Sequence, residues 1–192
     1  LRFQTVRADV GRVNGRYFAE TLSFGLDAAI ALDTMDRRQK SGRAGTMLYL
    51  ESAVDQLFHH LQVFSFKMDV LGAEPGCAPH PEWDDAYLVA VQVGPTYGGH
   101  FRITPKARLD DGLLDICWAT PELSSMRALA LLLRARGGKH TGSDHIHFRR
   151  ASSLVLDFEE EPPAQMDGEP VRGTHFVIDC VPDALTVVVG QR

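Results

Sequence analysis

Two carboxylates separated by a single glycine, Asp167 and Glu169, have residue types and spacing that could perform chemistry. Gly168 permits a sharp bend, and a carboxylate held at such a bend can accept the proton of a substrate hydroxyl during phosphoryl transfer. The neighbouring carboxylate could increase its partner's affinity for a proton or orient it. The same residues could also form an ordinary surface turn, so the spacing permits this chemistry and does not prove it.

The acidic turn Arg108–Leu113 is a second candidate site, because it places Asp110 and Asp111 before Gly112. A hard cation can be bound at such a turn by one carboxylate and nearby backbone carbonyls. Taken alone, the turn is equally typical of a hairpin. His145 and His147 would share one face of a strand, as zinc ligands sometimes do, but no third ligand stands at a useful spacing. We therefore expect both histidines to be ordinary surface or core residues.

Composition and charge narrow the class of protein. The 192 residues are 44% hydrophobic and 23% charged, which is typical of one globular domain with a sizeable core. A net charge of −5 argues against a primary nucleic-acid binder, which needs a basic face. No apolar run approaches the ~20 residues of a membrane span. The scattered cysteines Cys77, Cys117 and Cys180 indicate free thiols in a reducing cytosol, so a cytoplasmic location is expected.

The elements that must position these residues are mainly strands. Asn14-Gly15 between strand-like segments predicts a tight hairpin turn. From Thr46 to Phe64 the apolar residues alternate steps of four and three, which predicts an amphipathic helix. A second helix is predicted from Thr120, as its cap, to Gly137-Gly138. Apolar runs predict strands over residues 87–93, 113–119, 154–158, 171–180 and 184–189. The pattern predicts one mainly β domain, mostly antiparallel, with helices at its edge.

Several segments, taken together and in order, resemble the C-terminal domain of the soluble lipid kinases. This family includes diacylglycerol kinase catalytic domains, sphingosine and ceramide kinases, and their bacterial relatives. The matching segments extend over nearly the whole chain; they are Asn14–Phe18, Ser23–Ala28, Pro105–Ala107 leading to Asp111–Asp115, and Asp167–Glu169. The chain departs from the family's glycine-rich turn at Pro95–His100. The family's loop geometry and its acceptor lipid are therefore not carried over to this turn.

The resemblance implies a two-domain enzyme, on a plan shared with NAD kinases. Its N-terminal domain carries a Gly-Gly-Asp-Gly-Thr loop for the nucleotide, and its C-terminal domain is an antiparallel β-sandwich with two or three flanking helices that holds the lipid. This chain has no Gly-Gly-Asp-Gly-Thr and begins at Leu1. We therefore expect residues 1–192 to be the single C-terminal domain of a longer protein, and to be inactive as a kinase by themselves.

The resemblance also assigns roles to residues. Glu169 would be the general base and Asp167 its support. A structural magnesium ion would be held by the Asp111 carboxylate and the backbone carbonyls of Arg108 and Leu113. ATP, with magnesium, would be bound mainly by the N-terminal domain.

The function that we expect is that of an ATP-dependent lipid kinase acting on a lipid alcohol, with diacylglycerol as the leading candidate. Two alternatives stay open: a non-catalytic lipid-binding module and a NAD-kinase-like small-molecule kinase. The expected partners are the lipid, the protein's own N-terminal domain and, transiently, the inner membrane surface, with a homodimer left open. The lipid pocket is expected in the sandwich around Val89, Val91 and Leu156, with its mouth near Asp167 and Glu169. The candidate membrane-facing edge, otherwise a solvated loop, is formed by Arg37, Arg38, Lys40 and Arg43.

Overall fold

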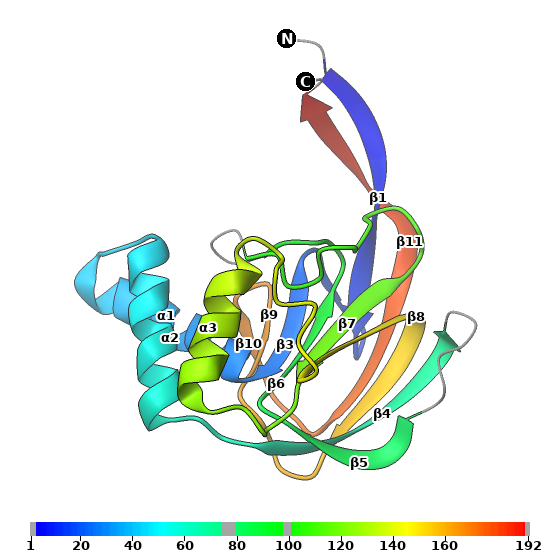
Figure 1. The fold of residues 1–192 in the computed structure, drawn as a ribbon. Helices are drawn as coiled ribbons and strands as arrows, with labels where there is room; N and C mark the ends of the chain where they lie inside the picture. The colour runs from blue at the N-terminus through cyan, green and yellow to red at the C-terminus, as the bar shows by residue number, and fades with distance from the viewer. Residues whose placement is uncertain (1–2, 74–79, 98–100, 191–192) are drawn as a thin grey trace.

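The computed structural model describes residues 3–73, 80–97 and 101–190, and within them the chain forms three helices and eleven strands (Figure 1). Cys77 and the turn residues 98–100 lie outside the described residues. The helices are α1 (Leu26–Ser41), α2 (Thr46–His59) and α3 (Ser125–Ala135). The strands are β1 (Phe3–Val13), β2 (Arg16–Phe18), β3 (Thr21–Gly25), β4 (Phe64–Ala73), β5 (His80–Ala86), β6 (Leu88–Gln92), β7 (Leu114–Ala119), β8 (Ile146–Phe158), β9 (Ala164–Met166), β10 (Glu169–Val171) and β11 (His175–Gly190).

The strands pair antiparallel in one curled sheet. Its order is β10-β9-β3-β6-β7-β8-β11-β1-β2, and β4 joins it through β8 with β5 at its side. Figure 1 shows the three helices gathered on one side of the sheet, while β1 and β11 extend from the body as a two-stranded ribbon. The mainly β, antiparallel fold class with flanking helices is thus confirmed. None of the helices in the described ranges is long and apolar enough to cross a membrane.

Two hydrophobic cores lie on the two sides of β6. The larger core lies inside the curl of the sheet, where the ring of Phe24 lies 4.8 Å from that of Phe158 and 4.7 Å from that of Phe176, centroid to centroid. The smaller core lies among the three helices. Successive side chains of a strand point to opposite faces, so Val89 and Val91 enter the larger core while Leu88 and Ala90 face the helices.

The features with local signals are confirmed. Asn14 and Gly15 form the β1–β2 turn, and both have positive φ angles, 46° and 83°, as a two-residue hairpin turn requires. Helix α2 begins at Thr46 as predicted. It ends at His59, before Phe64, because Phe64 starts β4 and pairs with Ala86 of β5.

The predicted start of the third helix at Thr120 is wrong. The Thr120 N–H donates to the carbonyl of His145, which ties this residue to the start of β8. Helix α3 begins five residues later, at Ser125, because Ser124 supplies the cap: its Oγ accepts a hydrogen bond from the N–H of Arg127 at 3.4 Å.

The predicted strands 171–180 and 184–189 also require correction. Val171 ends β10, and β11 runs without a break through Pro182 and Asp183. Asp183 has a positive φ of 54°, where the register between β1 and β11 shifts. The Asp9 carboxylate accepts a hydrogen bond from the Asp183 N–H at 2.9 Å, so the irregular step keeps its backbone donor satisfied.

Candidate functional site

Asp167 and Gly168 form the two-residue turn between β9 and β10. Their φ angles are 49° and 90°, and this pair of positive values explains why glycine stands at the second position. The turn lies against α1. The sulfur of Met35 on that helix is so close to Gly168 that a Cβ atom at this position would lie 3.7 Å from it. The structure therefore brings Asp167 and Glu169 together at one hairpin beside a helix.

The Asp167 carboxylate is fully engaged with the backbone. It accepts hydrogen bonds from the N–H groups of Ala19, at 2.6 Å, of Glu20, at 2.9 Å, and of Thr21, at 2.8 Å. These bonds join the β9–β10 turn to the loop between β2 and β3. The geometry gives Asp167 a positioning role, since its oxygens hold the turn in place.

Glu169 is different, because its side chain is exposed and makes no hydrogen bond or ion pair with any part of the chain that the structure describes. Its backbone is fixed by pairing with Met166 in β9. A carboxylate without a protein partner, on a rigid hairpin, is available to accept a proton from a bound hydroxyl.

Gln165 is a site residue that sequence reasoning missed. Its buried side chain donates from Nε2 to the Ser23 hydroxyl at 2.7 Å and accepts at Oε1 from the Gly168 N–H at 2.7 Å. It therefore holds the turn from the inside as Asp167 holds it from the outside. The available signal was a polar residue between the apolar residues Ala164 and Met166 of a short strand.

A second buried hydrogen bond between side chains lies near that of Gln165 with Ser23. Gln92 of β6 donates from Nε2 to the Thr21 hydroxyl at 2.6 Å, and both side chains are buried. These hydrogen bonds favour one arrangement of the strands β3, β6 and β9, because losing them would leave further buried donors and acceptors unpaired, although Gln92 Oε1 itself has no partner among the described residues. The β3–β9 edge of the sheet is thus built around the Asp167–Glu169 turn.

An apolar cavity lies between the helices and the sheet. Helix α3 contributes Ala128, Leu131, Leu132 and Ala135, while the sheet contributes Leu88, Ala90, Cys117 and Ala119. Its free volume is about 70 Å³. A water molecule occupies ~30 Å³ of liquid and pockets for drug-sized ligands measure ~300–1,000 Å³, so the cavity in this conformation is smaller than a typical ligand pocket.

The predicted lining of the lipid pocket is therefore wrong. Val89, Val91 and Leu156 are packed in the larger core and do not line this cavity. The error is one residue of strand register, because the neighbours Leu88 and Ala90 point toward the helices.

Three polar groups line the otherwise apolar cavity. Asp27 Oδ2, the Tyr97 hydroxyl and His140 Nδ1 are buried, and none has a hydrogen-bond partner among the described residues. Burial raises the pKa of Asp27 from 3.8 to about 6, although hydrogen bonds with Ser23 and Tyr49 oppose the shift. Buried, unpaired polar groups in a cavity are typical of a place where a ligand supplies the missing partners.

The acidic turn Arg108–Leu113 is neutralised in part by an arginine side chain from β8. Arg150 of β8 forms an ion pair with Asp111 and a longer contact, 3.4 Å, with Asp115. Asp111 Oδ1 also accepts a hydrogen bond from the Leu113 N–H at 3.2 Å, and Arg108 pairs with Asp110 at 3.3 Å. The Asp111 carboxylate is thus already engaged by a guanidinium group.

A divalent cation would fit this turn only in part. The Asp111 carboxylate and the carbonyls of Arg108 and Leu113 could supply oxygen ligands, but the ion would have to bind beside Arg150 or displace it. No group of three or more His, Cys, Asp or Glu side chains suited to a metal occurs within residues 3–73, 80–97 and 101–190. The magnesium site stays a prediction.

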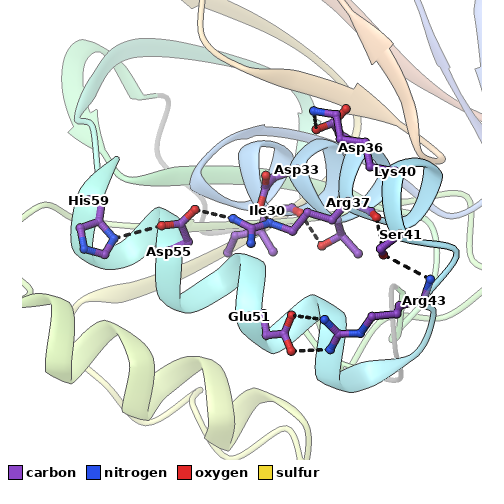
Figure 2. Close-up of polar contacts among 11 residues, drawn as sticks. Ile30, Asp33, Asp36, Arg37, Lys40, Ser41, Arg43, Glu51, Asp55 and His59 are labelled. Atoms are coloured by element: carbon purple, nitrogen blue, oxygen red, sulfur yellow. Dashed lines mark hydrogen bonds and ion pairs between the residues drawn. The ribbon is translucent and has the colours of Figure 1, made fainter.

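Three of the four basic residues at the α1–α2 connection, all but Arg38, carry acidic partners among the described residues (Figure 2). Arg37 pairs with Asp33 at 2.7 Å and also with Asp55, and Lys40 pairs with Asp36 at 2.5 Å. Arg43 forms a two-pronged pair with Glu51, which holds the pKa of Glu51 below its usual value. These partners reduce the positive field that this edge could present to a membrane.

The histidines behave as expected. His147 stacks on Trp118 with ring centroids 5.2 Å apart, and His145 lies 3.9 Å from Glu122. Neither belongs to a group of side chains in the described ranges that could hold a metal.

The family model of the YegS C-terminal NAD kinase beta sandwich-like domain matches residues 20–189. The chain belongs to this family. The YegS C-terminal domain match covers the three helices and includes both the Asp167–Glu169 turn and the cavity. The resemblance to lipid-kinase C-terminal domains is thereby confirmed.

Curated relatives of this YegS C-terminal domain carry the name "Probable lipid kinase YegS-like". The protein from Serratia proteamaculans is 25% identical over 96% of this chain and 56% of its own length. The protein from Pectobacterium atrosepticum is 29% identical over 96% of this chain and 57% of its own length. The chain spans about half the length of the curated relatives it matches.

Solved structures show the same fold. The crystal structure of a diacylglycerol kinase from Bacillus anthracis superimposes with a TM-score of 0.62 at 19% sequence identity, covering 95% of this chain and 53% of that one. A further crystal structure from the same organism gives a TM-score of 0.66 at 21% identity over 95% of this chain and 56% of that one. At these identities the likeness establishes the fold of the YegS C-terminal domain and not its substrate.

Proposed function

We propose that this domain is the lipid-holding and base-supplying half of an ATP-dependent lipid kinase. The acceptor is a lipid alcohol, with diacylglycerol as the leading candidate. The observation that carries the proposal is the exposed Glu169, which has no partner among the described residues and lies on a hairpin beside α1. The first turn of the same helix contributes Asp27 to the lining of the apolar cavity. The family membership and the names of the relatives support it.

The reaction assigns one proton transfer to this chain. Glu169 accepts the proton of the lipid hydroxyl as that oxygen attacks the γ-phosphorus of ATP, and the bond to ADP breaks. Asp167 and Gln165 hold the hairpin, so that the carboxylate does not have to be ordered when the substrate arrives. The nucleotide would be bound by the N-terminal domain, where magnesium, when bound, neutralises phosphate charge.

The apolar cavity would hold the lipid chain. Asp27 and Met35 are eight residues apart on α1, which corresponds to about 12 Å along the helix. A chain that starts at the hydroxyl near Glu169 can therefore extend along α1 into the cavity. Widening the cavity for that chain requires movement of one of its walls, and α3 is the helix with the fewest buried residues, Ala135 alone.

The test uses the full-length parent, ATP and detergent-dispersed diacylglycerol, with NAD offered in parallel. We expect phosphorylation of the lipid and not of NAD. Changing Ala128 to leucine, which narrows the cavity, should raise the KM for long-chain diacylglycerol about tenfold. The matched control is Ala130→Leu on the exposed face of the same helix, which should leave the KM unchanged.

Lipid binding without phosphorylation would instead indicate a non-catalytic module, and phosphorylation of NAD alone would indicate a small-molecule kinase. Equal KM values for the two leucine variants would place the lipid chain elsewhere.

A further inference from the structure

Helix α3 separates the cavity from solvent and has apolar side chains on both its inner and its outer face. Ala128, Leu131, Leu132 and Ala135 line the cavity at helical spacing. On the other side, Met126 and Leu133 are 65% and 48% exposed. Apolar side chains that face water on a helix already buried on its other face call for a second partner.

The chain segment that contains α3 is basic, although Glu122 and Asp144 flank it. Between Leu123 and Ser143 the sequence contains no aspartate or glutamate, although the whole chain has a net charge of −5. The same segment has four basic residues, all exposed: Arg127, Arg134, Arg136 and Lys139. Their side chains make no ion pair within residues 3–73, 80–97 and 101–190, in contrast to Arg37, Lys40 and Arg43. This segment therefore keeps its positive charge available for a partner.

Helix α2 extends the apolar part of the surface. It packs beside α3, as Figure 1 shows, and exposes Met47, Val54 and Phe58 at helical spacing. Apolar side chains next to cations on one helical surface are the pattern of helices that lie at the head-group level of a bilayer. Each lysine or arginine near an anionic membrane contributes on the order of 1 kcal/mol of attraction.

We propose that the outer face of α3, formed by Met126, Leu133, Arg127, Arg134, Arg136 and Lys139, docks this domain onto an anionic phospholipid bilayer. The inference rests on the proposed function, since a lipid substrate resides in a bilayer. Charge complementarity selects the occupant: the face carries unpaired cations beside apolar side chains, and an anionic bilayer offers the matching pair of properties. The inner face of the docked helix lines the cavity. In the docked state α3 alone would therefore separate the bilayer from the cavity that receives the lipid chain.

The test measures flotation of the full-length parent with vesicles of phosphatidylcholine alone and of phosphatidylcholine mixed with phosphatidylglycerol. Replacing Arg127, Arg134, Arg136 and Lys139 with alanine should weaken binding to the anionic vesicles at least about tenfold. The matched control replaces Arg37, Arg38, Lys40 and Arg43 with alanine. It removes the same number of charges from an edge where three of the four residues, all but Arg38, are ion-paired within the described part of the chain, and it should weaken binding far less. Added salt should weaken binding of the unmodified protein, because surface attraction acts within a Debye length.

A parallel assay on detergent-dispersed diacylglycerol separates this inference from the proposed function. The α3 variant should phosphorylate dispersed lipid at the normal rate. Absence of phosphorylation by the unmodified parent would refute the proposed function, whereas vesicle binding would still report on docking. Equal losses in the two charge variants, or no preference for anionic vesicles, would overturn the docking surface. A Met126→Ser/Leu133→Ser variant that dissociates an oligomer without affecting vesicle binding would show that a second copy covers this face.

Discussion

Replacing Glu169 with alanine in the full-length parent is expected to lower turnover by about 10²–10⁴ and to leave lipid binding almost unchanged. The reason is that the Glu169 side chain is exposed and makes no hydrogen bond or ion pair with another described residue, so its loss removes a proton acceptor and little else. Steady-state kinetics with dispersed diacylglycerol, together with an equilibrium binding measurement, check both halves of the expectation.

Two further variants make this result specific. Glu169→Gln keeps the shape of the side chain and cannot accept the proton, so it should be as slow as the alanine variant. Asp167→Asn should instead lower stability, because Asp167 accepts three backbone hydrogen bonds. Near-normal turnover in either Glu169 variant would show that Glu169 is not the general base.

Changing Asp27 to asparagine should stabilise the protein at neutral pH. Burial raises the pKa of Asp27 to about 6 from an ordinary value of 3.8, so the folded state binds this proton more tightly than the unfolded state does. The contribution of Asp27 to stability is therefore most favourable below about pH 4 and declines as the pH rises to about 6. The shift of about two pH units corresponds to roughly 3 kcal/mol of unfolding free energy.

Urea unfolding at several pH values measures this effect. The asparagine variant should be more stable than the parent at pH 7 and should lose that advantage near pH 4, because the parent's carboxyl is then protonated. The exposed Asp144→Asn variant is the control and should show no such difference. A destabilised Asp27→Asn protein at pH 7 would show that the hydrogen bonds with Ser23 and Tyr49 stabilise the ionised carboxylate by more than its burial costs. A costly carboxylate in an apolar cavity is otherwise a candidate for ligand contact.

The sequence predicted the features that depend on nearby residues. The Asn14-Gly15 turn, the start of α2 and the Asp167-Gly168 bend each follow from backbone preferences within a few positions. The lipid-kinase resemblance added the order of the motifs along the chain, which the family match confirms.

What the sequence could not predict depends on contacts between distant segments. The apolar run of β6 does not reveal which face meets the helices, so Val89 and Val91 were predicted to line a pocket, whereas they are packed in the larger core and Leu88 and Ala90 line the cavity. The acidic partners of Arg37 and Arg43 could not be predicted, because Asp55 and Glu51 come from the next helix. The strands β4 and β5 had no clear periodic signal, because β4 is held by pairing with the distant β8 and β5 by pairing with β4.

The most direct test of the central claim is to locate the lipid chain in the full-length parent. A diacylglycerol analogue with a photoreactive group at the end of one chain is bound, irradiated and mapped by mass spectrometry. The account predicts adducts on the inner face of α3, at Leu131 or Leu132, and on the facing strands at Ala90 or Cys117. Adducts confined to the outer residues Met126 and Leu133, or to the ribbon of β1 and β11, would contradict it.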